Sequence, residues 1–349
     1  MGLLTRAILN HPDKVAPFLL HERSHRKPAQ ADAIYRYDLL REKANLENPQ
    51  IFQICKYKNN FSAEYGQSER GGHFNDKNEV THMALDAATL ELTARELKTV
   101  LADAKIAKLF EPTRDELVIT LRTRTDTYAL LLSARSGSAR VCLTEETFEN
   151  PETPPSFCML MRKHLTGGKL LDVHMEPGDR IVYFDFQCTN EMGDLVRNTL
   201  CAELMGRYSN LVLVQNGKII DALKRVDFED SDVRQLLPGL PYTIPPKPAR
   251  PDFLQVSAAS IVAAACERDL PVADALNKTV AGVGPVVCRE AAWRAFDGEH
   301  LLANELDDAQ KRKLMAAIDE LKELHDQGGC PCSVTAPDGK PVEVTFFRP

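Results

Sequence analysis

The chain has 349 residues, of which 44% are hydrophobic and 27% are charged, so it carries enough apolar side chains for a packed core. Its net charge of −7 argues against a protein that binds nucleic acid by charge alone, although a local basic surface remains compatible with RNA recognition. No apolar run reaches the roughly 20 residues that cross a bilayer, and no charged-then-apolar leader opens the chain, so we expect no membrane insertion and no secretion.

The nine cysteines are odd in number and scattered, which is typical of reduced thiols and predicts a cytoplasmic protein. Cys330 and Cys332 have no second pair or suitably spaced histidine, so we predict no metal site. A phosphate-loop lysine motif, a G-x-S-x-G motif and an H-E-x-x-H motif are all absent from the sequence, and we expect no cofactor.

Residues 1–82 differ in charge from the rest of the chain. They hold 12 Lys and Arg against 10 Asp and Glu, a net of +2, which leaves 31 against 40, a net of −9, for residues 83–349. The segment shows no sustained helical or strand period, and its end from Ser68 to His82 is polar and unpatterned. We predict a poorly ordered extension, with short helices around 31–44.

From Met83 onward the pattern predicts an antiparallel α+β domain over 83–237. Asp86 is expected to cap a helix that ends near Leu101, and Asn216-Gly217 is a strong hairpin signal. A second helix is expected at Ser156–Leu165, ended by Gly167-Gly168. The expected strands are Lys105–Phe110, Leu117–Arg122, Tyr128–Ser133, Arg140–Leu143, Lys169–Met175, Arg180–Phe186, Thr199–Met205, Leu211–Gln215 and Lys218–Leu223.

Six prolines within 238–251 predict a linker over 238–255, followed by an all-α domain over 256–349 with a short β-like tail. Helices are expected at Ser257–Arg268, Pro271–Val280 and Pro285–Phe296, and in a last amphipathic helix that ends at Gly328-Gly329. The apolar face of that helix carries Leu306, Leu314, Ile318, Leu321 and Leu324.

The loop Gly282-Val283-Gly284-Pro285 joins two of these helices. A tight Gly-x-Gly loop at a helix N-terminus presents backbone N–H groups, which suit a phosphate in the manner of helix-hairpin-helix proteins. The alternative is a plain helical hairpin in which Gly282 and Gly284 only permit the turn. From spacing alone we treat the two interpretations as equal.

Asp179-Arg180 follows the Pro177-Gly178 turn, at the start of a strongly apolar strand. A guanidinium beside a carboxylate suits a base edge or a phosphate, whereas the alternative is a solvated turn with a weak ion pair. The residues alone favour the solvated turn.

Glu203 shares one strand face with Cys201 and Met205, so its carboxylate points where its neighbours are apolar. A buried carboxylate needs a cationic partner, for which Arg162, Arg180 and Arg207 are the candidates. The alternative is an exposed edge residue.

The helix from Ser156 ends in Arg162, Lys163 and His164. Cations at a helix C-terminus complement its dipole, which is the simpler interpretation, and the same cluster can also face phosphates.

From Met83 to the C-terminus the chain resembles the amino-terminal half of the NFACT family, whose bacterial members are often called fibronectin-binding protein A. The resemblance covers about three quarters of the chain. It is carried by Met83-Ala84-Leu85-Asp86, Phe157–Leu165 with Gly167-Gly168, Asp179-Arg180, Glu203-Leu204-Met205-Gly206-Arg207 with Ser209-Asn210, and Leu237-Pro238-Gly239 with Tyr242.

The resemblance implies a role in ribosome-associated quality control. Family members bind a large ribosomal subunit obstructed by peptidyl-tRNA and recruit alanyl-tRNA, and the ribosome then adds an untemplated alanine tail. We therefore expect no enzymatic activity. By resemblance, Asp179 and Arg180 match a pair needed for tRNA engagement, and Glu203-Leu204-Met205 matches a second functional triplet that usually reads Glu-Ile-Met.

The resemblance also implies a fold: a first domain similar to that of formamidopyrimidine-type DNA glycosylases, followed by a helix-hairpin-helix domain. Arg162, Lys163, Arg207, Gly282 and Gly284 are candidate phosphate contacts. The chain departs from the family in lacking the coiled-coil arm and second RNA-contacting domain. Residues 1–82 have no family counterpart, which we interpret as a start codon assigned too far upstream.

Two other classes of function are weighed. A DNA glycosylase needs a proline directly after its initiator methionine, followed by a glutamate, whereas Ala84 and Leu85 follow Met83. A fibronectin-binding adhesin needs export, for which no signal peptide is present.

Overall fold

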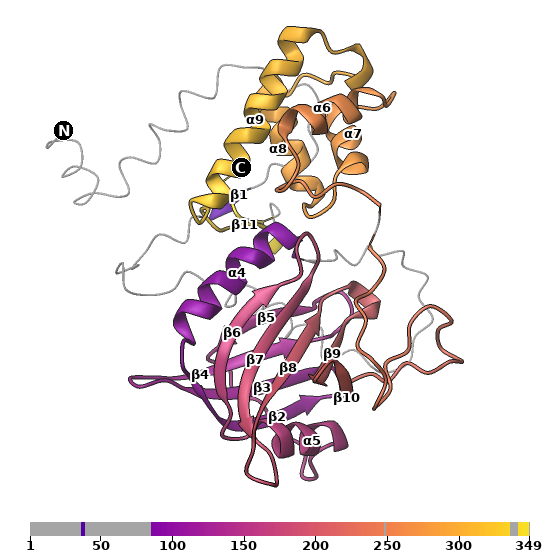
Figure 1. Cartoon of the computed structure of the whole chain (residues 1–349). Coiled ribbons are helices and arrows are strands. Elements are labelled where there is room, and N and C mark those ends of the chain that lie inside the picture. Colours follow the sequence, from indigo (N-terminus) through magenta and orange to yellow (C-terminus); the bar gives the residue numbers. More distant parts are fainter. Residues whose placement is uncertain (1–35, 39–84, 248, 336–340, 349) are drawn as a thin grey trace, which may run out of the picture.

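The computed structural model describes residues 36–38, 85–247, 249–335 and 341–348 (Figure 1). Of the amino-terminal extension it describes the strand β1 (Arg36–Asp38), which pairs with β11 (Cys332–Thr335) near the C-terminus. This strand lies where we predicted short helices, so that expectation is wrong for these three residues, because they gain backbone hydrogen bonds from a distant strand. The rest of 1–82 lies outside the described residues.

The main part of the molecule is an antiparallel sheet of nine strands, in the order β10-β9-β8-β7-β6-β2-β3-β4-β5. This agrees with the α+β class and the antiparallel pairing that the sequence predicted. The strands are β2 (Lys105–Thr113), β3 (Glu116–Arg122), β4 (Thr127–Ser133), β5 (Arg140–Thr144), β6 (Lys169–Met175), β7 (Ile181–Thr189), β8 (Leu195–Glu203), β9 (Asn210–Gln215) and β10 (Lys218–Ala222).

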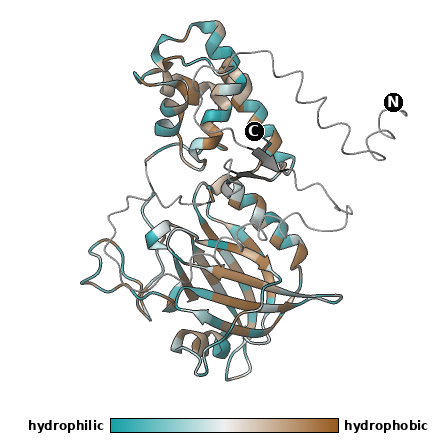
Figure 2. Cartoon of the chain, turned by 180° about the vertical axis from the view of Figure 1, so that it is seen from behind, coloured by the Kyte–Doolittle hydropathy of each residue, from teal (hydrophilic) through white to brown (hydrophobic). Residues whose placement is uncertain are grey.

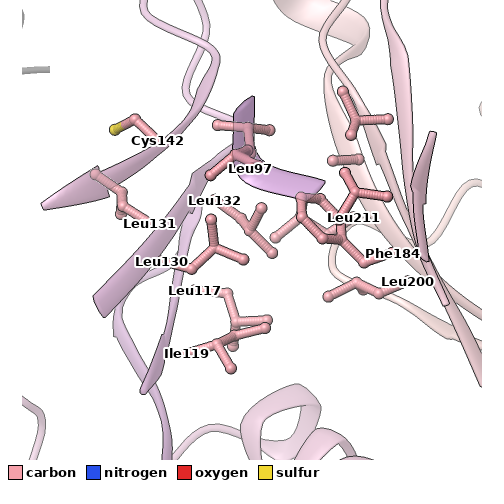
Figure 3. Packing of buried hydrophobic residues seen from close by; sticks show 14 of the residues in the cluster. Leu97, Leu117, Ile119, Leu130, Leu131, Leu132, Cys142, Phe184, Leu200 and Leu211 are labelled. Atoms are coloured by element: carbon pink, nitrogen blue, oxygen red, sulfur yellow. The ribbon is translucent and has the colours of Figure 1, made fainter. Parts of the chain in front are cut away.

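The sheet curls so that its two halves enclose one core. Leucines of β3 and β4 lie on one side of that core, and Phe184, Leu200 and Leu211 of β7–β9 lie on the other (Figure 3). Leu97 enters from α4 (Ala87–Val100), which packs along β6. Each of these labelled side chains is buried, and such burial stabilises a protein by about 1.5–3 kcal/mol per large apolar side chain.

Helix α5 (Ser156–Leu165) has the bounds that the sequence predicted, but its N-terminus is capped by another element. Pro155 occupies the N-cap and offers no side-chain hydrogen bond. Glu111 of β2 supplies the acceptor instead, because its carboxylate accepts from the N–H of Cys158 at 2.9 Å. Burial raises the pKa of Glu111, and the bond from Cys158 opposes that shift.

The outer face of β7–β10 is covered by the chain that follows β10. Val226 pairs with Leu236, and Leu240 and Tyr242 pack with Cys201 and Val212 in a second apolar cluster. Residues predicted to open a linker therefore lie against the sheet up to Tyr242.

The remaining helices form a second body: α6 (Ala258–Cys266), α7 (Val272–Thr279), α8 (Pro285–Phe296) and α9 (Asp308–Asp326). They share one core, into which Phe346 and Phe347 insert after β12 (Pro341–Thr345). Hydrophobic residues are concentrated in the strands of the large sheet and alternate with hydrophilic ones along the helices (Figure 2). In the part of the chain that is described, no helix is both long and apolar enough to cross a membrane.

The two bodies meet where the N-termini of α4 and α8 face each other. Asp86 caps α4 as predicted, because its Oδ1 accepts from the N–H of Thr89 at 2.8 Å. Its Oδ2 accepts from the N–H of Gly284 at 2.9 Å, and the N–H of Ala88 donates to the carbonyl of Gly282 at 3.0 Å. One carboxylate thus joins two helix N-termini that belong to different bodies.

Candidate functional site

Arg180 sits at the end of a turn that opens strand β7. The N–H of Asp179 donates to the carbonyl of Glu176 at 3.1 Å, and the Asp179 carboxylate accepts from the N–H of Arg180 at 2.7 Å. The carbonyl of Arg180 in turn accepts from the N–H of Leu204 at 2.8 Å. The backbone of Arg180 is fixed, whereas its guanidinium meets no hydrogen-bonding or ionic partner among the residues that the structure describes.

The turn itself is held from several sides. Lys247 Nζ contacts Glu176 Oε1 at 2.7 Å and the carbonyl of Pro177 at 3.0 Å, and the hydroxyl of Tyr183 donates to Glu176 Oε2 at 3.4 Å. Gly178 has a φ of +67°, and a Cβ at this position would lie 2.6 Å from Asp252 Oδ2. The turn therefore requires glycine here, both for its backbone conformation and for its close approach to the helical body.

Glu203 is buried, at 1% exposure, and finds a cationic partner that none of our candidates supplied. Its two oxygens accept from the guanidinium of Arg234, at 2.6 and 2.9 Å, and Oε1 also accepts from the hydroxyl of Tyr242 at 2.8 Å. The expectation that Arg162, Arg180 or Arg207 pairs with Glu203 is wrong. Sequence reasoning missed Arg234 because it lies 31 residues away, in a loop without regular secondary structure.

Glu203 and Arg180 belong to the same end of β7 and β8 but not to one exposed surface. Ile181 is the partner of Glu203 in the sheet, so Arg180 lies in the bend just before the paired strand, where it is half-buried, whereas Glu203 is buried. The buried Glu203 faces the covering chain after β10, whereas Arg180 lies at the rim. Glu203 is therefore not part of the surface around Asp179 and Arg180.

The residues after Glu203 leave the strand earlier than predicted. Leu204 is buried in the main core, and Met205 precedes a short 3₁₀ turn, η2 (Gly206–Tyr208), where Gly206 adopts a φ of +59°. Arg207 lies on this turn and stacks over the ring of Tyr208, with 4.6 Å between the guanidinium carbon and the ring centroid. Both side chains are exposed, near the same end of the sheet as Arg180.

The basic end of α5 lies elsewhere. Arg162 donates from Nε to the carbonyl of Leu109 at 2.9 Å, and Lys163 pairs with Glu191 at 2.9 Å. Glu191 follows the end of β7, so this cluster lies at the end of the strand opposite to Arg180. Burial and the neighbouring Lys163 lower the pKa of His164. The structure therefore does not bring Arg162 and Lys163 together with the turn of Arg180.

The hairpin loop 282–285 is already occupied. The N–H of Gly284 is bound to Asp86, and the carboxylates of Asp86 and Glu343 both lie within 4 Å of the place where a Gly284 Cβ would stand. An incoming phosphate would meet two negative charges and no free Gly284 donor. In this arrangement Gly282 and Gly284 join the two bodies, and the alternative of a structural turn fits the geometry better than a phosphate site.

Arg180 offers a cationic group at the end of the turn 176–180. The thiol of Cys201 on β8 is 1% exposed, and burial raises its pKa, which keeps it protonated. Among the described residues, no group of three or more His, Cys, Asp or Glu side chains is arranged to hold a metal ion. A fixed backbone with a free guanidinium suits recognition of a phosphate or a base edge.

Curated relatives match part of the chain. The chain is 31% identical over 243 residues to the Rqc2 homolog RqcH of Bacillus subtilis, a match that covers 69% of this chain and 41% of that protein. It is 38% identical over 166 residues to the Rqc2 homolog RqcH of Streptococcus pneumoniae serotype 2, which covers 47% of this chain and 30% of that protein. The matched region thus spans less than half the length of these relatives.

A solved structure and a family model agree with these matches. The N-terminal part of the fibronectin/fibrinogen-binding protein from Streptococcus suis superposes with a TM-score of 0.57 at 31% identity, covering 68% of this chain and 85% of that one. The likeness of the sheet to a glycosylase domain stays a prediction. The sequence model of the NFACT N-terminal and middle domains matches residues 86–349, and the chain therefore belongs to the NFACT family.

Proposed function

We propose that this chain is the tRNA-engaging part of a ribosome quality control factor. In this role it binds an obstructed large ribosomal subunit that carries peptidyl-tRNA, and it helps to recruit alanyl-tRNA for untemplated alanine tailing. Family membership and the relatives named RqcH support the general role. The observation that carries the tRNA contact is the guanidinium of Arg180, which has no bonded partner among the described residues, on a backbone held by Asp179 and Leu204.

A guanidinium on a fixed backbone suits a phosphate or a base edge. Arg presents a planar fork of donors that matches a phosphate or the edge of a guanine, and preorganisation lowers the entropy lost on binding. Asp179 uses its carboxylate to hold the backbone of Arg180. None of these groups is asked to make or break a covalent bond, because the ribosome would form the peptide bonds of the tail.

The test measures binding of the full chain to an alanine tRNA transcript by fluorescence anisotropy at low salt. Arg180→Ala should weaken binding by roughly 10- to 100-fold, which corresponds to one hydrogen-bonded charged contact of about 1.5–3 kcal/mol. Arg312→Ala, an exposed arginine on α9, removes the same charge elsewhere and should leave the affinity unchanged. Equal affinities for the wild type and Arg180→Ala would contradict the proposed contact and favour the interpretation of the turn as a solvated loop.

A second experiment separates tRNA from the ribosome. The same substitution is introduced at the matching position of a complete relative, and alanine tails and co-sedimentation with large subunits are measured in parallel. Tails should be lost while subunit association is retained, because the subunit is gripped over a broader surface. Persisting tails would contradict the assignment, and loss of both in a folded variant would move the contact of Arg180 to the ribosome.

Fibronectin binding is a weaker alternative, supported by the name of the Streptococcus suis neighbour. A glycosylase-like role has no support beyond the predicted likeness of fold. Binding of the wild-type chain to immobilised fibronectin, compared with tRNA under the same conditions, distinguishes the adhesin from the RNA binder.

A further inference from the structure

We propose that Glu203 acts on tRNA binding as a positioning residue: it anchors residues 234–247, here called the strap, and the strap holds the turn that presents Arg180. The inference rests on the proposed function and assigns a mechanical role to a residue that family resemblance marks only as functional. It follows from a continuous series of contacts that begins at Glu203 and ends at the turn 176–180.

The first anchor of the strap is the guanidinium of Arg234, which is bonded on three sides. Two of its nitrogens donate to Glu203, and Nε donates to the carbonyl of Thr243 at 2.6 Å. The side chain of Arg234 is 13% exposed and that of Glu203 is 2% exposed. Removing the carboxylate would leave a largely buried, unpaired cation, so this anchor is costly to break.

Between its ends the strap is bonded to the edge of the sheet. The N–H of Ile219 donates to the carbonyl of Leu240 at 2.8 Å, and the N–H of Gly239 donates back to Ile219 at 2.8 Å. The N–H of Tyr242 donates to the carbonyl of Gly217 at 2.9 Å. The middle of the strap therefore lies along β10 as an added edge, which fixes the path of the chain between the two anchors.

The second anchor is Lys247, whose ammonium holds both Glu176 and the carbonyl of Pro177. Glu176 is also the residue whose carbonyl accepts from Asp179, next to Arg180. A shift of Lys247 would thus move the turn 176–180, which carries Arg180 at its end. A misplacement of about 1 Å is enough to lose a well-aligned contact.

Direct contact between Glu203 and RNA is disfavoured by the same geometry. Both carboxylate oxygens are already bonded, and the residue is 1% exposed behind the strap. A carboxylate would also repel phosphates. If Glu203 matters for RNA binding, it must act through the residues that it holds.

The experiment is a double-mutant analysis of tRNA affinity in the full chain. Glu203→Gln weakens the first anchor and Lys247→Met weakens the second. We expect each to lower the affinity for tRNA by roughly 3- to 10-fold. In the Arg180→Ala background, neither change should lower it further, since the contact that they position is gone. Lys313→Met on α9 is the matched control for loss of one lysine charge and should have no effect.

A second measurement is the dependence of affinity on salt. Loss of one phosphate contact lowers the slope of log K against log salt by about 0.7–0.9. Because Glu203 carries no positive charge, a lower slope in Glu203→Gln would mean that Arg180 has lost its contact. Thermal unfolding identifies a variant that fails to fold, and Lys247→Met tests the proposal even if Glu203→Gln unfolds.

The outcomes separate this inference from the proposed function. If Arg180→Ala has no effect, or the wild type binds no tRNA, the proposed function fails. If Arg180→Ala weakens binding while the folded Glu203→Gln and Lys247→Met variants do not, only the positioning role is overturned. Additional losses in the Arg180→Ala background would also overturn it, because they would show that Glu203 or Lys247 acts independently of Arg180.

Discussion

The turn 176–180 and the hairpin loop 282–285 were both candidate anion sites in the sequence, and the structure separates them. At the turn, Arg180 has its backbone fixed and its guanidinium free among the described residues. At the hairpin loop, the N–H of Gly284 is already bound to Asp86. A donor at a helix N-terminus attracts an external anion only if no carboxylate of the same chain has reached it first.

The two loops also touch, which explains why they have different tasks. A Cβ at Gly282 would lie 2.9 Å from Asp252 Oδ1 and 3.9 Å from the Cα of Gly178, so the hairpin loop packs behind the turn. The hairpin thereby holds the helical body against the sheet at the place where Arg180 is presented. The hairpin loop supports this junction, and in our proposal the turn 176–180 is the part that binds tRNA.

The largest expected effect comes from adding one negative charge to each loop. Arg180→Glu should weaken binding to an alanine tRNA transcript by more than about 100-fold, because it removes an attractive contact and adds repulsion. Gly284→Asp places a third carboxylate beside Asp86 and Glu343, so it should lower the unfolding temperature and leave tRNA affinity unchanged in the folded protein. Both quantities are measured on both variants.

A loss of tRNA affinity in folded Gly284→Asp, at the level of Arg180→Glu, would erase the distinction between the two loops. It would restore the hairpin as a phosphate site.

A smaller effect is expected from removing the carboxylate that joins the two helix N-termini. Asp86→Ala should lower the free energy of unfolding by about 2–3 kcal/mol, because it removes an N-cap worth about 1 kcal/mol and a charged hydrogen bond to Gly284 worth about 1.5 kcal/mol. Urea denaturation measures the change. Asp307 caps α9 alone, because its side chain accepts from the N–H of Gln310. Asp307→Ala is therefore the matched control and should lower the free energy of unfolding by about 1 kcal/mol.

Equal losses in Asp86→Ala and Asp307→Ala would mean that the bond to Gly284 contributes nothing to stability. The hairpin loop would then be held by its apolar contacts alone.

The smallest expected effect concerns Glu343, the second carboxylate near Gly284. Burial raises the pKa of Glu343, an effect that Arg289 opposes and Asp86 reinforces. The folded state therefore binds a proton at the Glu343 carboxyl more tightly than the unfolded state does. The ionised carboxylate lowers the free energy of unfolding at neutral pH, and this loss is absent below about pH 4.5. Glu343→Gln should raise the unfolding midpoint at pH 7 and lose that advantage as the pH falls through the raised pKa towards 4.5.

The measurement is the urea midpoint of wild type and variant between pH 4 and pH 7.5. A lower midpoint for Glu343→Gln at pH 7 would show that attraction to the N-terminus of α8 and to Arg289 outweighs burial. The hairpin loop would then accept a further negative charge after all.

Local signals in the sequence predicted most elements of the sheet domain. Asp86 was expected as an N-cap and is one, α5 has its predicted bounds, and Asn216-Gly217 forms the turn of a hairpin. These elements depend on residues within a few positions of each other, so the pattern carries the information. Element ends were less accurate: β8 stops at Glu203 and not at Met205, because Gly206 turns the chain into η2.

Asp179-Arg180 was also found from the sequence, but its weight came from family resemblance. The residues alone favoured a solvated turn. Two contacts distinguish it from a solvated turn: the backbone bond between Arg180 and Leu204, and the contact of Lys247 with Glu176. Leu204 and Lys247 both lie far from Arg180 in the sequence. Pairs of strands and loops that meet only after folding supply this information.

The sequence by itself determined much of the local chemistry of this protein: which residues cap helices, where hairpins turn, and that a carboxylate at position 203 needs a cation if it is buried. Tertiary structure decided which cation it is, since Arg234 approaches Glu203 across 31 positions of chain. It also gave Asp86 a second helix to cap, 198 residues away, and so gave the N–H of Gly284 a partner within the chain. The physical reason is that a charge requires a partner whatever its position in the chain, and only the packing of distant segments determines which partner arrives.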